Sequence, residues 1–173
     1  MDALEVIRTR RSVRKYSSTA VPQESVELML RAAMAAPSAG DQQPWRFVVV
    51  RDSERLRGLA SAGPHGGMIE RAPVAIVVCA DLGRVRHDGF WIQDCSAATE
   101  NLLLAAHALG LGAVWVGTYP REDRVKSVGE VLGLREPLLA FAVVAIGYAS
   151  EPVAPVDRFD PKRVYMETYE ERT

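Results

Sequence analysis

Five positively charged side chains lie close together near the start of the chain, in the stretch RTRRSVRKYS. They are Arg8, Arg10, Arg11, Arg14 and Lys15. Arg10, Ser12 and Arg14 supply two forked guanidinium groups and a hydroxyl, a combination that suits a phosphate monoester. One phosphate does not require all five charges. Taken alone, the stretch is equally typical of a solvated basic surface or of a weak nucleic-acid-binding arm.

A second polar stretch, APSAGDQQPW at residues 36–45, combines small residues with hydrogen-bonding side chains and one aromatic ring. The hydrogen-bonding groups belong to Ser38, Asp41, Gln42 and Gln43. With Trp45 as an aromatic platform, this composition suits a polar heteroaromatic ring. The alternative is a plain helix-to-strand turn that ends in a core tryptophan.

A third stretch, GLGAVWVGTY at residues 110–119, places glycines around an aromatic strand. At Gly117 a backbone N–H can come close to a flat ligand, because glycine has no side chain. The alternative is a helix stop at Gly110 and a strand end at Gly117.

The chain is poor in reactive side-chain groupings. Its histidines, His65, His87 and His107, form no HxxxH or HExxH pair, so a metal site is not expected. Cys79 and Cys95 lack CxxC spacing and lie in apolar stretches, which predicts reduced thiols in the core. No serine elbow of the GxSxG type is present. If the protein is an enzyme, a cofactor carries its chemistry.

Composition narrows the class of protein. With 173 residues, 48% apolar and 25% charged, the chain predicts one globular domain with an appended tail. The 21 Lys and Arg against 22 Asp and Glu exclude a strongly basic protein that binds nucleic acid over its whole surface. We expect no secretion signal and no membrane span, because charges or glycines interrupt each apolar segment, and we expect a cytoplasmic protein.

Hydrophobic periodicity predicts the elements that position these residues. Helices are expected over residues 2–9, between Pro22 and Pro37, and over residues 52–62, 90–109 and 121–134. Strands are expected over residues 45–52, 72–81, 112–117 and 138–148. The strand at 72–81 is apolar at consecutive positions, which predicts a central strand buried on both faces. The helix at 90–109 carries one formal charge after Asp94, so we expect it to be buried, with another subunit as one candidate for its covering.

The last 25 residues hold three prolines, many charges and little periodicity. They cannot form a core of their own. They are either a disordered tail or an arm packed on the same domain or on a partner. The apolar side chains favour the arm, namely Phe159, Val164, Tyr165 and Tyr169.

Four segments in this order and spacing resemble the nitroreductase family of FMN-dependent oxidoreductases. The segments are RRSVRKY, APSAGDQQPWRFVVV, DCSAATENLLLAAHALGLGAVWVG and AIGY. The resemblance implies an α+β fold around a central, mainly antiparallel sheet flanked by helices. It also implies a homodimer joined through the long central helix, in which residues 1–148 form the FMN-binding domain and residues 149–173 form an arm that packs on the partner subunit.

The resemblance further implies which residues hold FMN. The motif for the phosphate and ribityl chain is matched by Arg10, Arg11, Ser12 and Arg14, joined by Lys162 or Arg163 from the arm. The loop that the second subunit brings to the same flavin is matched by Pro37, Ser38, Asp41 and Gln43, and the backbone beside flavin N5 by Val116 and Gly117. Asp41 stands where the commonest motif has Asn. Because a carboxylate accepts but cannot donate, it disfavours anionic reduced flavin unless it turns away or Gln42 or Gln43 replaces it.

The implied activity is reduction of nitroaromatics, quinones or similar small-molecule electron acceptors by NADH or NADPH. Hydride passes through flavin N5 in a ping-pong sequence, at active sites on the subunit interface and without metal, nucleic acid or membrane. Two alternatives stay open. One is a specialised relative that fragments flavin or dehalogenates its substrate, and the other is a flavin-binding module without turnover.

Overall fold

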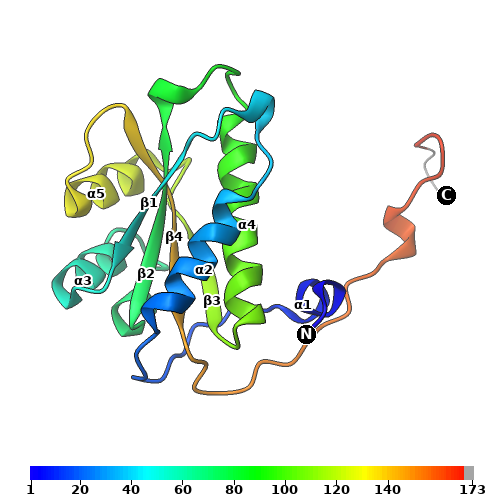
Figure 1. Ribbon diagram of the computed structural model, residues 1–173, viewed down its shortest axis with the longest axis horizontal. Coiled ribbons are helices and arrows are strands. Elements are labelled where there is room, and N and C mark those ends of the chain that lie inside the picture. The colour runs from blue at the N-terminus through cyan, green and yellow to red at the C-terminus, as the bar shows by residue number, and fades with distance from the viewer. Residues whose placement is uncertain (170–173) are drawn as a thin grey trace.

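The computed structural model describes residues 1–169 and is built around a four-stranded antiparallel sheet (Figure 1). The strands are β1 (Trp45–Val50), β2 (Val74–Asp81), β3 (Gly112–Gly117) and β4 (Leu138–Gly147). Their order across the sheet is β1-β2-β4-β3. Every neighbouring pair is antiparallel, so the expected mainly antiparallel sheet is confirmed.

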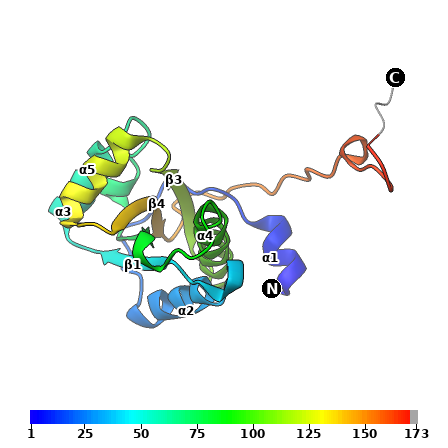
Figure 2. The same cartoon turned by 90° about the horizontal axis from the view of Figure 1, so that it is seen from above.

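Two helices cover each face of the sheet, as the view from above shows (Figure 2). On one face lie α2 (Gln23–Met34) and α4 (Trp91–Ala108), and on the other lie α3 (Ser53–Ser61) and α5 (Glu122–Leu132). A short N-terminal helix, α1 (Ala3–Thr9), lies beside α4. Each helix and strand falls within a few residues of the range that periodicity predicted. The α+β architecture is therefore confirmed.

Alternating side chains of β2 build the core on both sides of the sheet. Val77 and Cys79 pack toward α3 and α5, whereas Ile76 lies in the cluster beneath α2 and α4. All three are fully buried, and each large aliphatic side chain buried in this way contributes roughly 1.5–3 kcal/mol. The consecutive apolar pattern of this segment thus has the predicted cause, a central strand covered on both faces.

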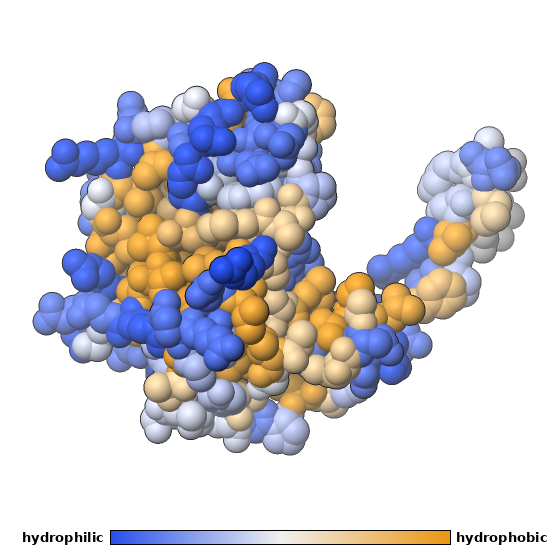
Figure 3. Space-filling model, in the orientation of Figure 1, coloured by the Kyte–Doolittle hydropathy of each residue, from blue (hydrophilic) through white to orange (hydrophobic). Residues whose placement is uncertain are grey.

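Residues 149–169 leave the domain as an extended arm that ends far from the sheet (Figure 1). A single 3₁₀ turn, Pro161–Arg163, interrupts it. The arm carries several exposed apolar side chains (Figure 3), and Phe159 is 77% exposed. On α1, Leu4 is 79% exposed and Ile7 also faces outward. The arm and α1 therefore expose apolar surface that the described part of the chain leaves uncovered. The remainder of the predicted arm, 170–173, lies outside the described residues.

No helix within residues 1–169 is both long enough and apolar enough to span a membrane.

Candidate active site

The basic loop between α1 and α2 is fixed along the outer edge of β3. The N–H of Val13 donates to the carbonyl of Ala113 at 3.0 Å, and Ser12 forms a parallel bridge with the same residue. A side chain at Gly112 would meet Val13, because a Cβ there would lie 2.6 Å from its Cγ1. Glycine at this position is therefore required for the loop to approach the strand.

The far end of the loop is anchored to β4. The hydroxyl of Tyr16 lies 2.6 Å from the carbonyl oxygen of Val13 and 3.0 Å from that of Ala145, and burial raises its pKa. Lys15 forms an ion pair with Glu151 at the start of the arm, at 2.9 Å. The neighbouring residue, Arg14, instead lines a cleft on the domain surface. Arg14 and Lys15 therefore have different surroundings although they are consecutive in the loop.

This cleft has a volume of about 610 Å³ and opens beside β3. It is lined by Arg14 from the basic loop, by Pro64, His65, Gly67 and Met68 from the turn after α3, by residues 114–117 of β3, and by Arg124 of α5. Among the described residues, no Asp or Glu lines it. The fold therefore brings together three of the predicted residues, Arg14, Val116 and Gly117, in a cleft that holds two guanidinium groups and, within residues 1–169, no opposing carboxylate.

The edge of β3 presents backbone groups to this cleft. Along an antiparallel strand, alternate residues direct both N–H and C=O to the same edge. The carbonyl of Ala113 accepts from the basic loop across the outer edge, so the backbone polar groups of Trp115 and Gly117 point to that edge as well. At Gly117 the carbonyl accepts from Arg124 Nη1 at 3.0 Å. The N–H of Gly117 is left at the same edge, where a ligand in the cleft can accept from it.

Two residues of the cleft gave no sequence signal. Arg124 fits the polar face of an amphipathic helix, and His65 lies in the turn GPHGG, which matches no known ligand motif. Both reach the cleft only because α3 and α5 pack on the same face of the sheet.

Of the two alternatives for Trp45, the aromatic platform is wrong. Its side chain is 5% exposed and lies in a core cluster with Val78 and Trp91. As the first residue of β1, it points inward to the end of the sheet that α4 covers. The core-tryptophan alternative holds at this position.

A second candidate segment, the loop from Pro37 to Gln43, owes its shape to one buried amide. Gln42 is 2% exposed, and its Nε2 donates to Asp94 Oδ2 at 2.6 Å. Its Oε1 accepts the backbone N–H groups of Arg86 at 2.9 Å and His87 at 3.0 Å. Gln42 is therefore committed to the protein itself and cannot replace Asp41 in contacting a ligand.

The residues around Gln42 face outward. Gly40, Asp41 and Gln43 have φ angles of +52°, +52° and +45°, a backbone region that is costly for residues other than glycine. The carboxylate of Asp41 accepts from Gln43 Nε2 at 2.6 Å, and Ser38 Oγ accepts the N–H of Gln43 at 3.1 Å. The loop thus groups four predicted residues, Pro37, Ser38, Asp41 and Gln43. None of its residues lines the cleft, which lies on the α3 and α5 side of β3, whereas this loop joins α2 to β1 (Figure 1).

The remaining predicted residues are engaged elsewhere. The Nε of Arg10 lies 3.3 Å from Glu100, the lone formal charge of α4 after Asp94. The guanidinium of Arg11 donates to the carbonyls of Arg10 and Val156, which ties the loop to the arm. Lys162 and Arg163 lie in the 3₁₀ turn of the arm, far from the domain (Figure 1).

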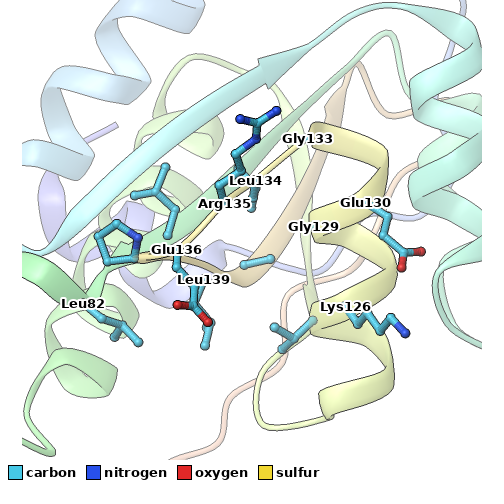
Figure 4. Close-up of a pocket in the computed structure, with 13 residues that line it drawn as sticks. Leu82, Lys126, Gly129, Glu130, Gly133, Leu134, Arg135, Glu136 and Leu139 are labelled. Atoms are coloured by element: carbon cyan, nitrogen blue, oxygen red, sulfur yellow. The ribbon is translucent and has the colours of Figure 1, made fainter.

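A larger cleft, of about 760 Å³, lies between α5 and the start of β4 (Figure 4). Its centre is apolar, with Leu82 and Leu139 among its lining residues, while Lys126 and Glu130 point outward from α5. It contains none of the predicted site residues. Its size therefore does not make it the candidate active site.

The two cysteines are buried and free, as expected for core thiols. Burial raises the pKa of Cys79 to about 12, and burial together with Asp94 raises that of Cys95 to about 12. A thiol of this kind is protonated at neutral pH and is a poor nucleophile.

The antiparallel sheet with helices on both faces defines an α+β domain. The cationic cleft, which opens on the edge of β3, suits an anionic ligand. The family model described as the nitroreductase family matches residues 7–63 and 59–148. The chain belongs to the nitroreductase family.

Individual relatives agree with this assignment. A protein of Methanothermobacter thermautotrophicus, provisionally named NADH dehydrogenase/NAD(P)H nitroreductase, is 48% identical over 98% of this chain and 88% of its own length. A crystal structure of a protein with the same provisional name from Bacteroides thetaiotaomicron is 43% identical, with a TM-score of 0.93 over 96% of this chain and 98% of that one. A structure from Desulfovibrio desulfuricans, provisionally described as a nitroreductase in complex with FMN, is 34% identical, with a TM-score of 0.85 over 98% and 99% of the two chains.

Proposed function

We propose that the protein is an FMN-dependent oxidoreductase that uses NADH or NADPH to reduce nitroaromatics, quinones or similar small-molecule acceptors. The observation that carries the proposal is the backbone edge of β3 at Gly117, which faces a cleft beside the guanidinium of Arg14. When bound, FMN supplies the hydride chemistry that the side chains lack. Similarity to an FMN complex supports this choice of cofactor.

The cleft fits the needs of a flavin. The guanidinium of Arg14 can hold negative charge that develops on the ring system during reduction. At Gly117 a backbone N–H can donate to a ring nitrogen without steric hindrance. Ser12, on the same loop, offers a hydroxyl donor for a phosphate, and Arg10 can add its guanidinium if it gives up its ion pair with Glu100. No side-chain acid is needed to transfer the hydride itself, so the absence of Asp and Glu from the lining within the described residues does not count against this chemistry.

We propose further that the active site is shared between two subunits of a homodimer. The loop from Pro37 to Gln43 and the turn with Lys162 and Arg163 do not line the cleft of their own chain, and in this proposal a second chain supplies them. The exposed apolar side chains of α1 and of the arm give such a dimer surface to bury. In this arrangement residues 1–148 form the flavin-binding domain, and residues 149–173 form the arm on the partner.

The visible spectrum of the purified protein tests the cofactor and the reaction together. We expect a flavin absorption band that bleaches when NADH or NADPH is added without oxygen. The band should return when a quinone or a nitroarene is added. A colourless protein that also fails to take up added FMN would refute the proposal.

A matched pair of variants tests the cleft. Arg14→Gln should weaken FMN binding at least about tenfold, because a charge-assisted hydrogen bond contributes roughly 1.5–3 kcal/mol. Lys15→Gln is the control, since Lys15 has the same charge in the same loop but pairs with Glu151. Equal losses of FMN affinity in the two variants would indicate a general effect of charge and would contradict a specific site.

Mixed dimers test whether the site is shared. Arg14→Gln changes the cleft, whereas Gln43→Ala changes the loop assigned to the partner. In a heterodimer of these two variants, a shared site leaves one of the two active sites with no substitution. Co-expression should therefore restore activity that each variant lacks alone. No restoration in purified heterodimers would place the whole site within one chain.

A further inference from the structure

Arg124 joins the two walls of the candidate active site. Its Nη1 donates to the carbonyl of Gly117 at 3.0 Å, on the β3 side. On the opposite side its stem lies over Gly63, where an added Cβ would be 3.1 Å from Nε and 3.2 Å from Cδ. One side chain from the first turn of α5 thus contacts both the strand edge and the turn that follows α3.

The contact falls where the backbone most needs support. Gly117 is the last residue of β3 and is exposed, and as a glycine it has no side chain to pack against its neighbours. The carbonyl of Gly117 shares one rigid peptide plane with the N–H of Thr118, so the bond from Arg124 restrains the plane that leaves Gly117 at the end of β3. Arg124 therefore holds the Gly117–Thr118 peptide, the backbone next to the N–H that Gly117 presents to the cleft.

The same side chain brings a permanent positive charge to this end of the cleft. Arginine stays protonated at all accessible pH values, and Arg124 is half-buried, so solvent screens its field only in part. A fixed cation stabilises whichever bound state is more negative. For a flavin, that is the reduced state.

We propose that Arg124 is a positioning residue that holds the Gly117 edge and raises the reduction potential of the flavin bound beside it. This inference rests on the proposed function, because it requires FMN in the cleft. It assigns to Arg124 a role distinct from that of Arg14, which lies on the basic loop rather than on α5.

The test is the midpoint potential of FMN in the full-length protein, titrated with a dye and a chemical reductant so that turnover is not required. Arg124→Gln keeps an amide donor but loses the charge. We expect its preference for reduced over oxidised FMN to fall about tenfold, which makes the potential about 30 mV more negative. Arg121→Gln is the matched control, because Arg121 lies outside the cleft at the start of the same helix. It should change the preference less than about twofold, or about 9 mV.

Other outcomes separate the two proposals. A wild-type protein that binds no FMN would refute the proposed function itself. The wild-type protein can bind FMN while Arg124→Gln changes the preference for reduced over oxidised FMN by less than twofold, or by no more than Arg121→Gln does. Either result would overturn the role of Arg124 and leave the proposed function intact. Should Arg124→Gln not fold, Arg124→Met carries the same criterion.

Discussion

Replacement of Gln42 by leucine tests whether one buried amide holds the loop from Pro37 to Gln43. Leucine is similar in size but can neither donate to Asp94 nor accept from the N–H groups of Arg86 and His87. A hydrogen bond to a charged group contributes roughly 1.5–3 kcal/mol, and a buried polar group left unpaired costs about 1–3 kcal/mol. Three groups lose Gln42 as their partner, and the lost bond to Asp94 together with one unpaired N–H already predicts a loss of about 2.5–6 kcal/mol.

A loss of that size is large beside the usual stability of a domain, about 5–15 kcal/mol. For a chain of this length, 1 kcal/mol shifts the melting temperature by roughly 2–4 °C, so Gln42→Leu should lower it by at least about 5 °C. Thermal unfolding, followed by circular dichroism at fixed protein concentration, measures the shift. Gln43→Leu is the matched control, since Gln43 is exposed and its side chain bonds Asp41 alone, and it should cost no more than about 0.5 kcal/mol. If the two variants melt within a degree of each other, the reasoning about Gln42 is wrong.

Three further predictions follow from close contacts and pKa shifts. Gly112→Ala should cost about 1–3 kcal/mol in urea unfolding, because its Cβ would overlap three side-chain atoms of Val13, the Cβ at 2.7 Å among them; Val13→Gly removes all three, so the double variant should lose less than the two single variants added together, and full additivity would contradict the contact. Cys79 and Cys95 should react with an aromatic disulfide reagent far more slowly in the native protein than in urea, since burial raises both pKa values; rapid native labelling would show an open core. Burial, then Arg10 and Arg11, lower the pKa of His107, so the folded state resists its protonation and the free energy of unfolding should fall as pH drops below about 6.5. His107→Gln should flatten that pH dependence between pH 7.5 and pH 5.5, and an unchanged slope would assign it to other groups.

The sequence by itself determined the elements. Periodicity is a local property, so the helices, the strands and the doubly buried strand β2 were readable from the order of apolar and polar residues. The cationic stretch around Arg14 and the glycine at 117 were also visible, because each is a matter of composition over a few positions. The family followed from four such stretches in one order.

Only the tertiary structure decided which of these residues meet. Arg14 reaches Gly117 because the basic loop is bonded along the outer edge of β3, a contact between segments about a hundred residues apart. Arg124 joins them because α5 packs beside α3, and no local pattern records that packing. The inward direction of Trp45 depends in the same way on the helix that covers its strand. Contacts between distant segments follow from strand order and helix packing, which depend on the whole chain at once, whereas the pattern within one segment reports only which of its faces is buried.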